Sequence, residues 1–509
     1  MYPCSPRTIP YRNPSKLADG RFGGPPATLP VDISADQMPG QQNQPEVPIQ
    51  DELPEIICAL VRPAGDDPRF QSDEGIRANR AEFLKRVHAT WKQVHKRALE
   101  EILKIEGILT PDHRKELPKE FVWFLDRTAL IWRRVNDALV WLLVGQQDHV
   151  IRQVCHRKDR PRLSEANLEP MLKFLERVNA DPQTIVIWSD ATTCVDVGDI
   201  VCKSFGGGLN GFIEVKEGAM NDKILDLLFT TGTKEEIISR ISTFEEQYGA
   251  QAMKQLDRVV RQHQRQQQVL EILEYDRGFH PHVQADVTIS QSAVLVESYD
   301  RQLQGIIDRS ENSVVLECID RCLWVYADRN PLKSADEKIR DYHQALISAC
   351  PESMQWLHQH LGDAEPFIAI PVEENLFCPE AIPLFLRPFD PETIRDLLIG
   401  RLMHSAFVFF DWHEFGQMIT ELGAQLTWST AKEGRRTNAK PRPQRRATFG
   451  GRIARIQLPE GHFIEGLSKI YRILFDGITP GTIAAQYIAQ LKQGPPAESE
   501  NPRRRTRRS

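Results

Sequence analysis

The chain has 509 residues, of which 41% are hydrophobic and 26% charged, a composition typical of a globular protein with more than one core. Its formal net charge of −6 excludes binding of a polyanion by bulk electrostatics, so contact with nucleic acid would need local basic patches. There is no run of about 18 apolar residues and no basic-then-apolar leader, so we expect a cytoplasmic protein without a membrane partner. The nine cysteines form no Cys-x-x-Cys pair and are expected to be reduced thiols.

The first predicted elements follow a segment rich in Pro, Gly and Gln. Residues 1–50 have few large apolar side chains and cannot bury enough surface to offset their ordering entropy, so they are expected to be disordered. Residues 51–119 are predicted to be helical, with apolar side chains at helical spacing from Ser72 to about 107. A second helix, about 120–155, is apolar on more than one face and is expected to be largely buried.

A change of periodicity marks the middle of the chain. A helix is predicted over 165–179, ended by Asp181-Pro182, and the pattern then becomes strand-like. Three short apolar runs are predicted strands: residues 185–188, 195–203 and 212–216. Helical spacing returns near residue 221 and persists, with several breaks, to about Tyr275.

The C-terminal third alternates between strand and helix patterns. A hairpin is predicted over 314–326, and residues 331–490 are predicted to form an α/β accessory domain with a strand at 406–410. A basic loop is expected at 431–455, and residues 491–509 are expected to be a disordered, Arg-rich tail.

The most informative motif is Gly198-Asp199, followed about fifteen residues later by Glu214-Val215-Lys216 on the next predicted strand. Side chains two apart in a strand point to the same face, so Glu214 and Lys216 are expected to share one. Two carboxylates can hold Mg²⁺ or Mn²⁺ through oxygen ligands, and the ion stabilises charge on a phosphate and acidifies a bound water. A nearby lysine favours the resulting hydroxide.

This arrangement resembles the signature of the PD-(D/E)XK (restriction-endonuclease-like) nuclease superfamily, with Gly198 in place of the leading proline. The resemblance implies a mixed α/β fold in which residues 120–330 form the core: a helix, a three-stranded mixed sheet, a helix and a strand. It also implies that Asp199 and Glu214 are metal ligands for Mg²⁺ or Mn²⁺ and that Lys216 positions the attacking water.

Many members of that superfamily carry a further acidic residue on the first helix. Asp137 is the candidate for this position, with Asp148 as the alternative, and Glu217 or Asp190 is a further candidate ligand. Asp190, Asp196 and Glu217 are also expected to lie close to the motif, where unpaired acids repel one another unless a cation binds or some of them are protonated.

The predicted basic loop at 431–455 is the main candidate for contact with nucleic acid. Its cations are Lys432, Arg435, Arg436, Lys440, Arg442, Arg445 and Arg446. Flexible basic segments neutralise phosphates without reading sequence, so this loop and the Arg-rich tail are predicted to bind DNA. A solubilising role for the loop and tail is the alternative.

Three other signals are interpreted as structural. Residues 206–211 match G-x-G-x-x-G, but a strand is predicted to follow where a dinucleotide site needs a helix, so a hairpin loop is the preferred interpretation. Two His-x-His pairs have no third ligand nearby: His280 with His282, and His358 with His360. Asp411 and His413 follow a predicted strand, where α/β sites often lie, but a strand end with a helix cap is preferred.

The sequence therefore predicts a Mg²⁺-dependent DNA nuclease, acting as an endonuclease in defence against foreign DNA or in DNA processing, with a homodimer as one possible assembly. The alternative is a nuclease-fold protein without activity that serves as a nucleic-acid-binding or scaffold module. A metal-dependent hydrolase of small phosphoesters is a third possibility. Metal-dependent cleavage of DNA separates the three.

Overall fold

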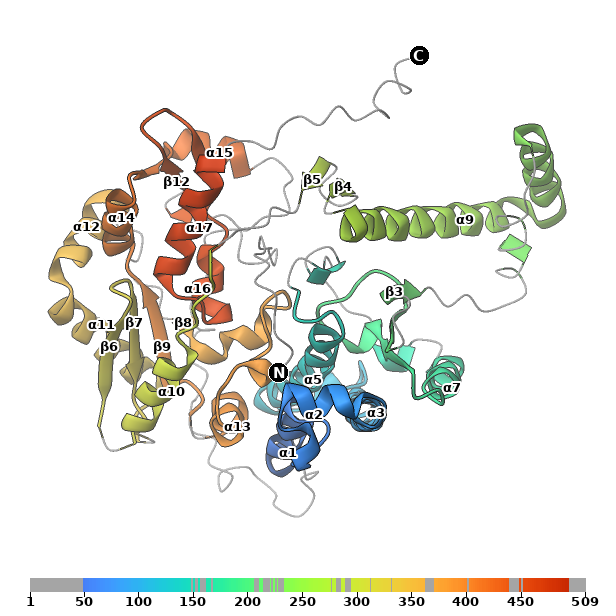
Figure 1. Ribbon diagram of the computed structural model, residues 1–509, viewed down its shortest axis with the longest axis horizontal. Helices are drawn as coiled ribbons and strands as arrows, with labels where there is room; N and C mark the ends of the chain where they lie inside the picture. The colour runs from blue at the N-terminus through green and yellow to red at the C-terminus, as the bar shows by residue number, and fades with distance from the viewer. Residues whose placement is uncertain are drawn as a thin grey trace. The chain divides into compact units, whose positions relative to one another are not determined.

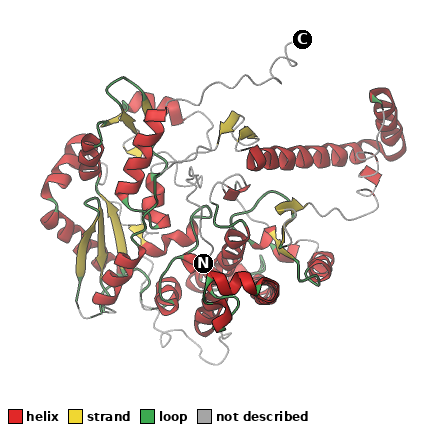
Figure 2. Ribbon diagram, viewed as in Figure 1, coloured by secondary structure: helices red, strands yellow, loops and turns green. Residues whose placement is uncertain are grey.

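The structure is a computed structural model of the chain, and it describes residues 49–493 with internal gaps. The residues left out between these limits are 148–149, 152–153, 156–161, 166–167, 206–209, 214–219, 221–222, 225–226, 228–232, 276, 281–284, 289–293, 312, 331, 362–369, 401, 439–447 and 450–451. The described chain is mixed α/β, with more helix than strand and several small antiparallel sheets (Figure 2). None of the described helices is both long and apolar enough to cross a membrane.

The chain divides into two compact units, which are described separately. Residues 62–289 form the central unit, and residues 290–509 together with the N-terminal segment up to Val61 form the terminal unit. This division differs from the predicted boundaries at 120 and 330. Helix α3 (Arg80–Ile108) packs on α5 (Lys119–Leu143), which keeps residues before 120 in the central unit. Residues 315–327 belong to the terminal unit because their strands pair with a strand near residue 408.

The central unit is built on helices around a small sheet (Figure 1). Its helices are α2 (Asp73–Ala78), α3, α4 (His113–Glu116), α5, α7 (Leu168–Val178) and α9 (Lys234–Tyr275), with 3-10 turns η2 (Pro68–Phe70), η3 (Leu163–Glu165) and η4 (Ser189–Ala191). Ser72 caps α2 by accepting from the Gly75 amide at 3.1 Å, in agreement with the predicted helix start. Helix α5 ends at Leu143, before the predicted end, where Gly145 adopts a φ of 66°.

Three strands form the sheet of the central unit. They are β1 (Thr184–Trp188), β2 (Ile200–Ser204) and β3 (Asn210–Ile213). The order is β1-β2-β3 and both pairings are antiparallel, so the prediction of a mixed three-stranded sheet is wrong. Helices α3, α5 and α7 all contact β1, which explains its uninterrupted apolar run from Ile185 to Trp188. Strands β2 and β3 pair antiparallel on either side of the glycine-rich segment, whose residues 206–209 lie outside the described residues.

The second predicted strand begins later than expected. Val195 and Val197 are buried, but they lie in the loop before β2 and not in a strand. The amides of this segment bond elsewhere: the Val195 amide donates to Thr192 Oγ1 at 3.2 Å and the Asp196 amide to the Val154 carbonyl at 2.8 Å. Burial without ladder pairing therefore produced the apolar pattern that resembles a strand.

Helix α9 is bent at Gly249, where φ is 73°, so two helical arms meet at this residue (Figure 1). Both arms contribute to one apolar cluster, with Phe244 from the first arm and Ala252, Leu256 and Val259 from the second, which also contains Ile224 from the preceding segment. At its C-terminal end α9 packs on a hairpin of β4 (Arg277–His280) and β5 (Ala285–Thr288). The predicted end of the helical region near Tyr275 is confirmed.

The terminal unit contains two antiparallel sheets and a larger set of helices. The first sheet has the order β6 (Val315–Ile319), β7 (Leu323–Ala327), β9 (Ala406–Phe410) and β8 (Ile370–Pro371). The second joins β10 (Gln425–Trp428), β12 (Arg452–Gln457) and β11 (Thr448–Phe449), with β13 (Phe463–Glu465) also paired to β12. The helices are α1 (Ile49–Val61), α10 (Asp300–Arg309), α11 (Ala335–Ala349), α12 (Pro351–Leu361), α13 (Pro391–Ile399), α14 (Trp412–Glu421), α15 (Ala431–Asn438), α16 (Ile470–Asp476) and α17 (Pro480–Gln493), with 3-10 turns η5 (Val372–Phe377) and η6 (Leu384–Leu386).

Part of the predicted basic loop at 431–455 is regular structure. Helix α15 starts after Thr430, whose hydroxyl accepts from the Glu433 amide at 3.2 Å while the Glu433 carboxylate accepts from the Thr430 amide at 2.8 Å. This reciprocal capping satisfies two amides that would otherwise lack partners. Strand β12 follows within the same predicted loop, so the prediction of a continuous loop is wrong for the described residues.

A buried ion pair lies at the centre of the terminal unit. Arg387 Nε donates to Asp300 Oδ1 at 2.9 Å, and both side chains are almost fully buried. Gly477, with a φ of 72°, packs directly against this pair and ends α16. A methyl group at Gly477 would lie 2.7 Å from Arg387 Nη2 and closer still to Asp300 Oδ1.

Gly477→Ala is therefore expected to lower the free energy of unfolding of the terminal unit by about 2–4 kcal/mol, through backbone strain and displacement of the buried pair. Gly423→Ala is the matched control, because Gly423 has a φ of 87° but no atom within 4 Å of the added methyl group. The control should cost about 1 kcal/mol, from the backbone alone. Urea unfolding of both variants gives the comparison, and equal losses would show that the contact with the ion pair contributes nothing.

Candidate functional site

The loop of residues 189–199, between β1 and β2, is held in place by the buried polar face of α5. Asn136 Nδ2 donates to the Ala191 carbonyl at 3.0 Å, and Arg133 donates to the Asp190 carbonyl. Arg133 also pairs with Glu106 of α3 at 2.8 Å. These side chains come from helical positions on one side of α5 and replace backbone pairing that the loop lacks.

Asp137, on the same helix, is fully buried and bonds to the loop through both carboxylate oxygens. Oδ1 accepts from the amides of Thr193 and Cys194, the latter at 3.0 Å, and Oδ2 accepts from the Thr193 hydroxyl. Oδ2 also forms an ion pair with Arg134 at 2.9 Å. With this set of partners Asp137 fixes the loop, which differs from the open metal ligand that the sequence suggested.

Cys194 illustrates how closed this environment is. Its side chain is fully buried, and burial together with the charge of Asp137 raises the pKa of the thiol. It is one of eight cysteines in the described chain, none of which forms a disulfide. A neutral thiol packed beside a buried carboxylate supports the conclusion that this part of the loop is a core and not a reactive surface.

His95 of α3 joins the same network from the other side. Its Nε2 accepts from the Trp188 amide at 3.2 Å, which places the ring proton on Nδ1, where it is donated to Asn136 Oδ1 at 2.8 Å. Burial lowers the pKa of His95 to about 4, so the ring is neutral at pH 7. The end of β1 is thereby tied to both α3 and α5.

Asp199 is the predicted site residue that this scaffold positions. It is half-buried, directly precedes β2, and follows Gly198, whose φ of 75° turns the chain into the strand. The Asp199 carbonyl accepts from the Ser189 amide at 2.9 Å, which extends the β1–β2 ladder by one bond. Since Ile200 pairs with Ile213, Asp199 lies at the end of the sheet where the described part of β3 stops.

The remaining residues of the predicted catalytic set lie outside the described residues. These are Glu214, Lys216, Glu217 and the alternative helix acid Asp148. Of the predicted metal ligands, the structure describes Asp199, Asp190 and the buried Asp137. Among the residues that the structure describes, no three His, Cys, Asp or Glu side chains form a group that could hold a metal ion.

One negative charge of the predicted acidic cluster is balanced by an arginine. The Asp196 side chain is 4% exposed and lies 3.3 Å from Arg265 Nη2 of α9. Its charge therefore has a protein partner, and the repulsion expected between Asp196 and its acidic neighbours is reduced. Arg265 could not have been paired with Asp196 from the sequence, because they are far apart in the chain and no motif connects them.

Three of the predicted nucleic-acid contacts, Lys432, Arg435 and Arg436, are exposed on α15. The other four, Lys440, Arg442, Arg445 and Arg446, fall outside the described residues, as does the Arg-rich tail.

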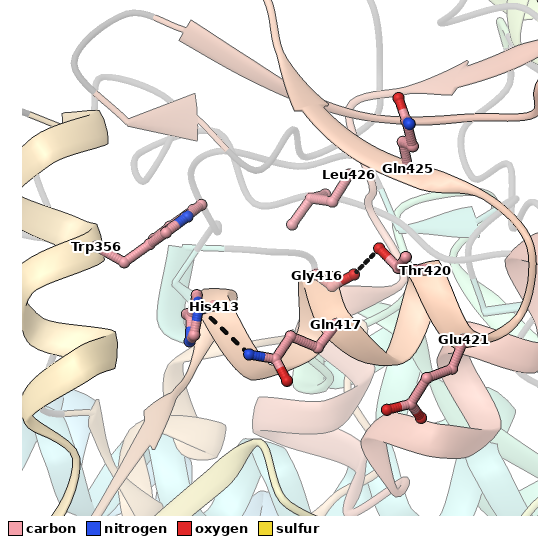
Figure 3. A pocket seen from close by; sticks show the side chains of 8 residues that line it. All are labelled: Trp356, His413, Gly416, Gln417, Thr420, Glu421, Gln425 and Leu426. Atoms are coloured by element: carbon pink, nitrogen blue, oxygen red, sulfur yellow. Dashed lines mark hydrogen bonds between the residues drawn. The ribbon is translucent and has the colours of Figure 1, made fainter.

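A hollow of about 570 Å³ opens on the terminal unit between α12, α14 and β10 (Figure 3). It is lined by Trp356, His413, Gly416, Gln417, Thr420, Glu421, Gln425 and Leu426. The Trp356 and His413 rings lie 6.0 Å apart, and Glu421 is paired with Arg321 at 2.9 Å. Only His413 was singled out from the sequence, because the hollow arises from tertiary packing and not from a local motif.

Asp411 has the capping role preferred from the sequence. It is fully buried after β9 and accepts from the amides of His413 and Glu414 at 3.0 and 3.1 Å, which fixes the start of α14. Of the two His-x-His pairs, His282 lies outside the described residues.

The chain was compared with known protein families, curated proteins and solved structures. No protein-family model, curated protein or solved structure matches the chain.

Proposed function

We propose that this protein is a metal-dependent nuclease that hydrolyses phosphodiester bonds of DNA, with Asp199, Glu214 and Lys216 as its catalytic residues. The observation that carries the proposal is the pairing of Ile200 with Ile213. In this antiparallel register the start of β2 at Ile200 and the described end of β3 at Ile213 lie at the same end of the sheet. In the sequence Asp199 directly precedes Ile200 and Glu214 directly follows Ile213.

In this proposal Asp199 and Glu214 would hold a Mg²⁺ or Mn²⁺ ion, which when bound stabilises charge on the scissile phosphate and acidifies a water. Lys216 follows Glu214 by two residues and would hold the attacking water as hydroxide through its charge. Binding of the metal requires the two carboxylates to be brought together against their repulsion.

The network behind Asp199 supports such a role. A ligand must be held within a fraction of an ångström of its working position, and this is achieved when neighbouring groups fix its backbone. Asp137, Asn136 and Arg133 fix residues 190–194, and the Ser189 amide fixes the Asp199 carbonyl. A function in defence against foreign DNA or in DNA processing fits this proposal.

The test is cleavage of plasmid, linear duplex, single-stranded DNA and RNA with Mg²⁺, with Mn²⁺ and with EDTA. Wild-type protein is expected to cleave DNA only with the metal, and Lys216→Ala to reduce the rate by about 100-fold or more. Lys203→Ala, which removes the same charge on the neighbouring strand at the other end of the sheet, should leave the rate unchanged.

Two results would overturn the proposal. DNA binding without cleavage under any divalent ion would favour an inactive nuclease-fold scaffold. Turnover of a small phosphodiester with indifference to DNA would favour a hydrolase of small substrates.

A further inference from the structure

The second arm of α9, after the bend at Gly249, carries four cations at helical spacing: Lys254, Arg258, Arg261 and Arg265. The intervals of four, three and four residues place them within an arc of about 60° at 100° per residue. They therefore form one stripe along a single face of the helix, named here the α9 stripe.

The apolar side of α9 fixes the direction in which the α9 stripe points. Ala252, Leu256 and Val259 are buried in the apolar cluster with Phe244 of the first arm and with Ile224. At the same 100° per residue, these positions lie about 130–190° from the centre of the stripe, on the opposite side of the helix. Lys254, Arg258 and Arg261 are accordingly exposed, whereas Arg265 is half-buried against Asp196.

The charge of this segment contrasts with that of the whole chain. Residues 250–268 contain four Lys or Arg and one acid, Asp257, which gives a net charge of 4 − 1 = +3, against −6 for the chain. Seven glutamines fill most of the remaining polar positions and can hydrogen-bond without adding charge. The surface fits a partner with a row of negative charges.

The length of the α9 stripe also fits a nucleic-acid backbone. Eleven residues separate Lys254 from Arg265, a distance of about 16 Å along the helix axis. One strand of a duplex carries a charge about every 3.4 Å of axis, so the stripe spans several phosphates. Cations on a rigid helix contact such charges without reading bases.

The C-terminal end of the α9 stripe lies at the candidate site. Arg265 pairs with Asp196, which is in the same loop as Asp199 and only three residues before it. A strand bound along the stripe would approach the end of the sheet where Asp199 lies. This geometry connects the predicted binding surface and the predicted ligand within one unit.

We propose that the α9 stripe binds the phosphate backbone of a nucleic acid, independently of base sequence, and directs it to the loop that carries Asp199. The delivery to Asp199 rests on the proposed nuclease function, whereas binding to the α9 stripe does not. The basic residues of α15 belong to the other unit and are not part of this surface.

The experiment measures binding of the full-length protein to fluorescent single-stranded and duplex DNA in EDTA, between 50 and 200 mM salt. The test variant is Lys254→Gln/Arg258→Gln/Arg261→Gln, which keeps good helix formers. The control, Lys85→Gln/Lys96→Gln/Lys104→Gln, removes three positive charges from exposed positions of α3 in the same unit.

For duplex DNA the test variant is expected to reduce the slope of log affinity against log salt by about 2 to 3, since each lost phosphate contact contributes about 0.9. The control should keep the wild-type slope. The proposal is wrong if wild-type protein does not bind DNA, if the test variant keeps the wild-type slope, or if both variants lose it equally.

Cleavage assays on the same variants separate this proposal from the nuclease function. If the test variant has a reduced salt slope but the wild-type protein does not cleave DNA with Mg²⁺ or Mn²⁺, the α9 stripe is a binding surface and the proposed nuclease function is wrong. If the test variant cleaves DNA and keeps the wild-type salt slope, the nuclease function is supported and the α9 stripe is not the binding surface.

Discussion

Asp137→Asn is expected to lower the free energy of unfolding of the central unit by about 3–5 kcal/mol, because it breaks a buried ion pair and removes the charge to which the loop amides of Thr193 and Cys194 donate. Arg134 and Asp137 are 1% and 0% exposed, so water cannot replace the lost carboxylate. The amide of asparagine would also bring a second set of N–H donors against those of Arg134 or Thr193. Urea unfolding, monitored by tryptophan fluorescence, measures the change in the free energy of unfolding.

The matched control for Asp137→Asn is Asp126→Asn on the same helix. Asp126 pairs with Arg114, but these side chains are 44% and 48% exposed. A surface pair of this kind contributes about 0–1 kcal/mol, so the control should cost little. If both substitutions had the same small effect, the buried network would not be what holds residues 190–194.

A double-variant cycle tests the pair itself. Adding Arg134→Met to Asp137→Asn removes both charges of the buried pair, so the double variant should be less destabilised than the sum of the single ones by about 1–3 kcal/mol. Additive losses would assign the effect of Asp137 to its bonds with Thr193 and Cys194 alone.

The structure also shows which parts of the fold were accessible from local sequence patterns. The predicted strand at 406–410 coincides with β9 because five consecutive residues are buried on both faces. The predicted hairpin at 314–326 is formed by β6 and β7. Helix α15 carried the signal that was overlooked, since Thr430 and Glu433 have the spacing of a capping box.

What local patterns could not supply is pairing between distant segments. The register of Leu323 with Phe410 moves residues 315–327 into the terminal unit, and nothing near either residue specifies it. In the candidate site, the sequence singled out Asp137 as an acid on a helix. It could not show that Arg134 and Thr193 occupy its oxygens, because these bonds depend on how α5 and the loop pack together.

The second large expected effect is a loss of stability in mild acid caused by His95. Burial lowers the pKa of His95 to about 4 in the folded protein, from the ordinary value of 6.5. Between these values the unfolded chain binds a proton that the folded protein does not, so stability decreases as pH falls through this window. The loss from His95 is about 2 kcal/mol between pH 7.5 and pH 5, and about 3 kcal/mol once pH reaches 4.

His95→Gln separates this titration from other acid effects. A glutamine amide can still accept from the Trp188 amide and donate to Asn136, but it does not bind a proton in this range. The variant is expected to lose less stability between pH 7.5 and pH 5 than the wild type, whatever its stability at neutral pH. Some slope should remain, because burial also lowers the pKa of His88 in the same unit.

The control is His113→Gln, at an exposed position on α4, which should keep the wild-type dependence of stability on pH. Urea unfolding of the three proteins at pH 7.5 and pH 5 is sufficient, because most carboxylates remain ionised in this range. A His95→Gln variant as acid-sensitive as the wild type would mean that the ring is not held neutral. The tie between Trp188, His95 and Asn136 could then not hold the end of β1, and the positioning of Asp199 would need another cause.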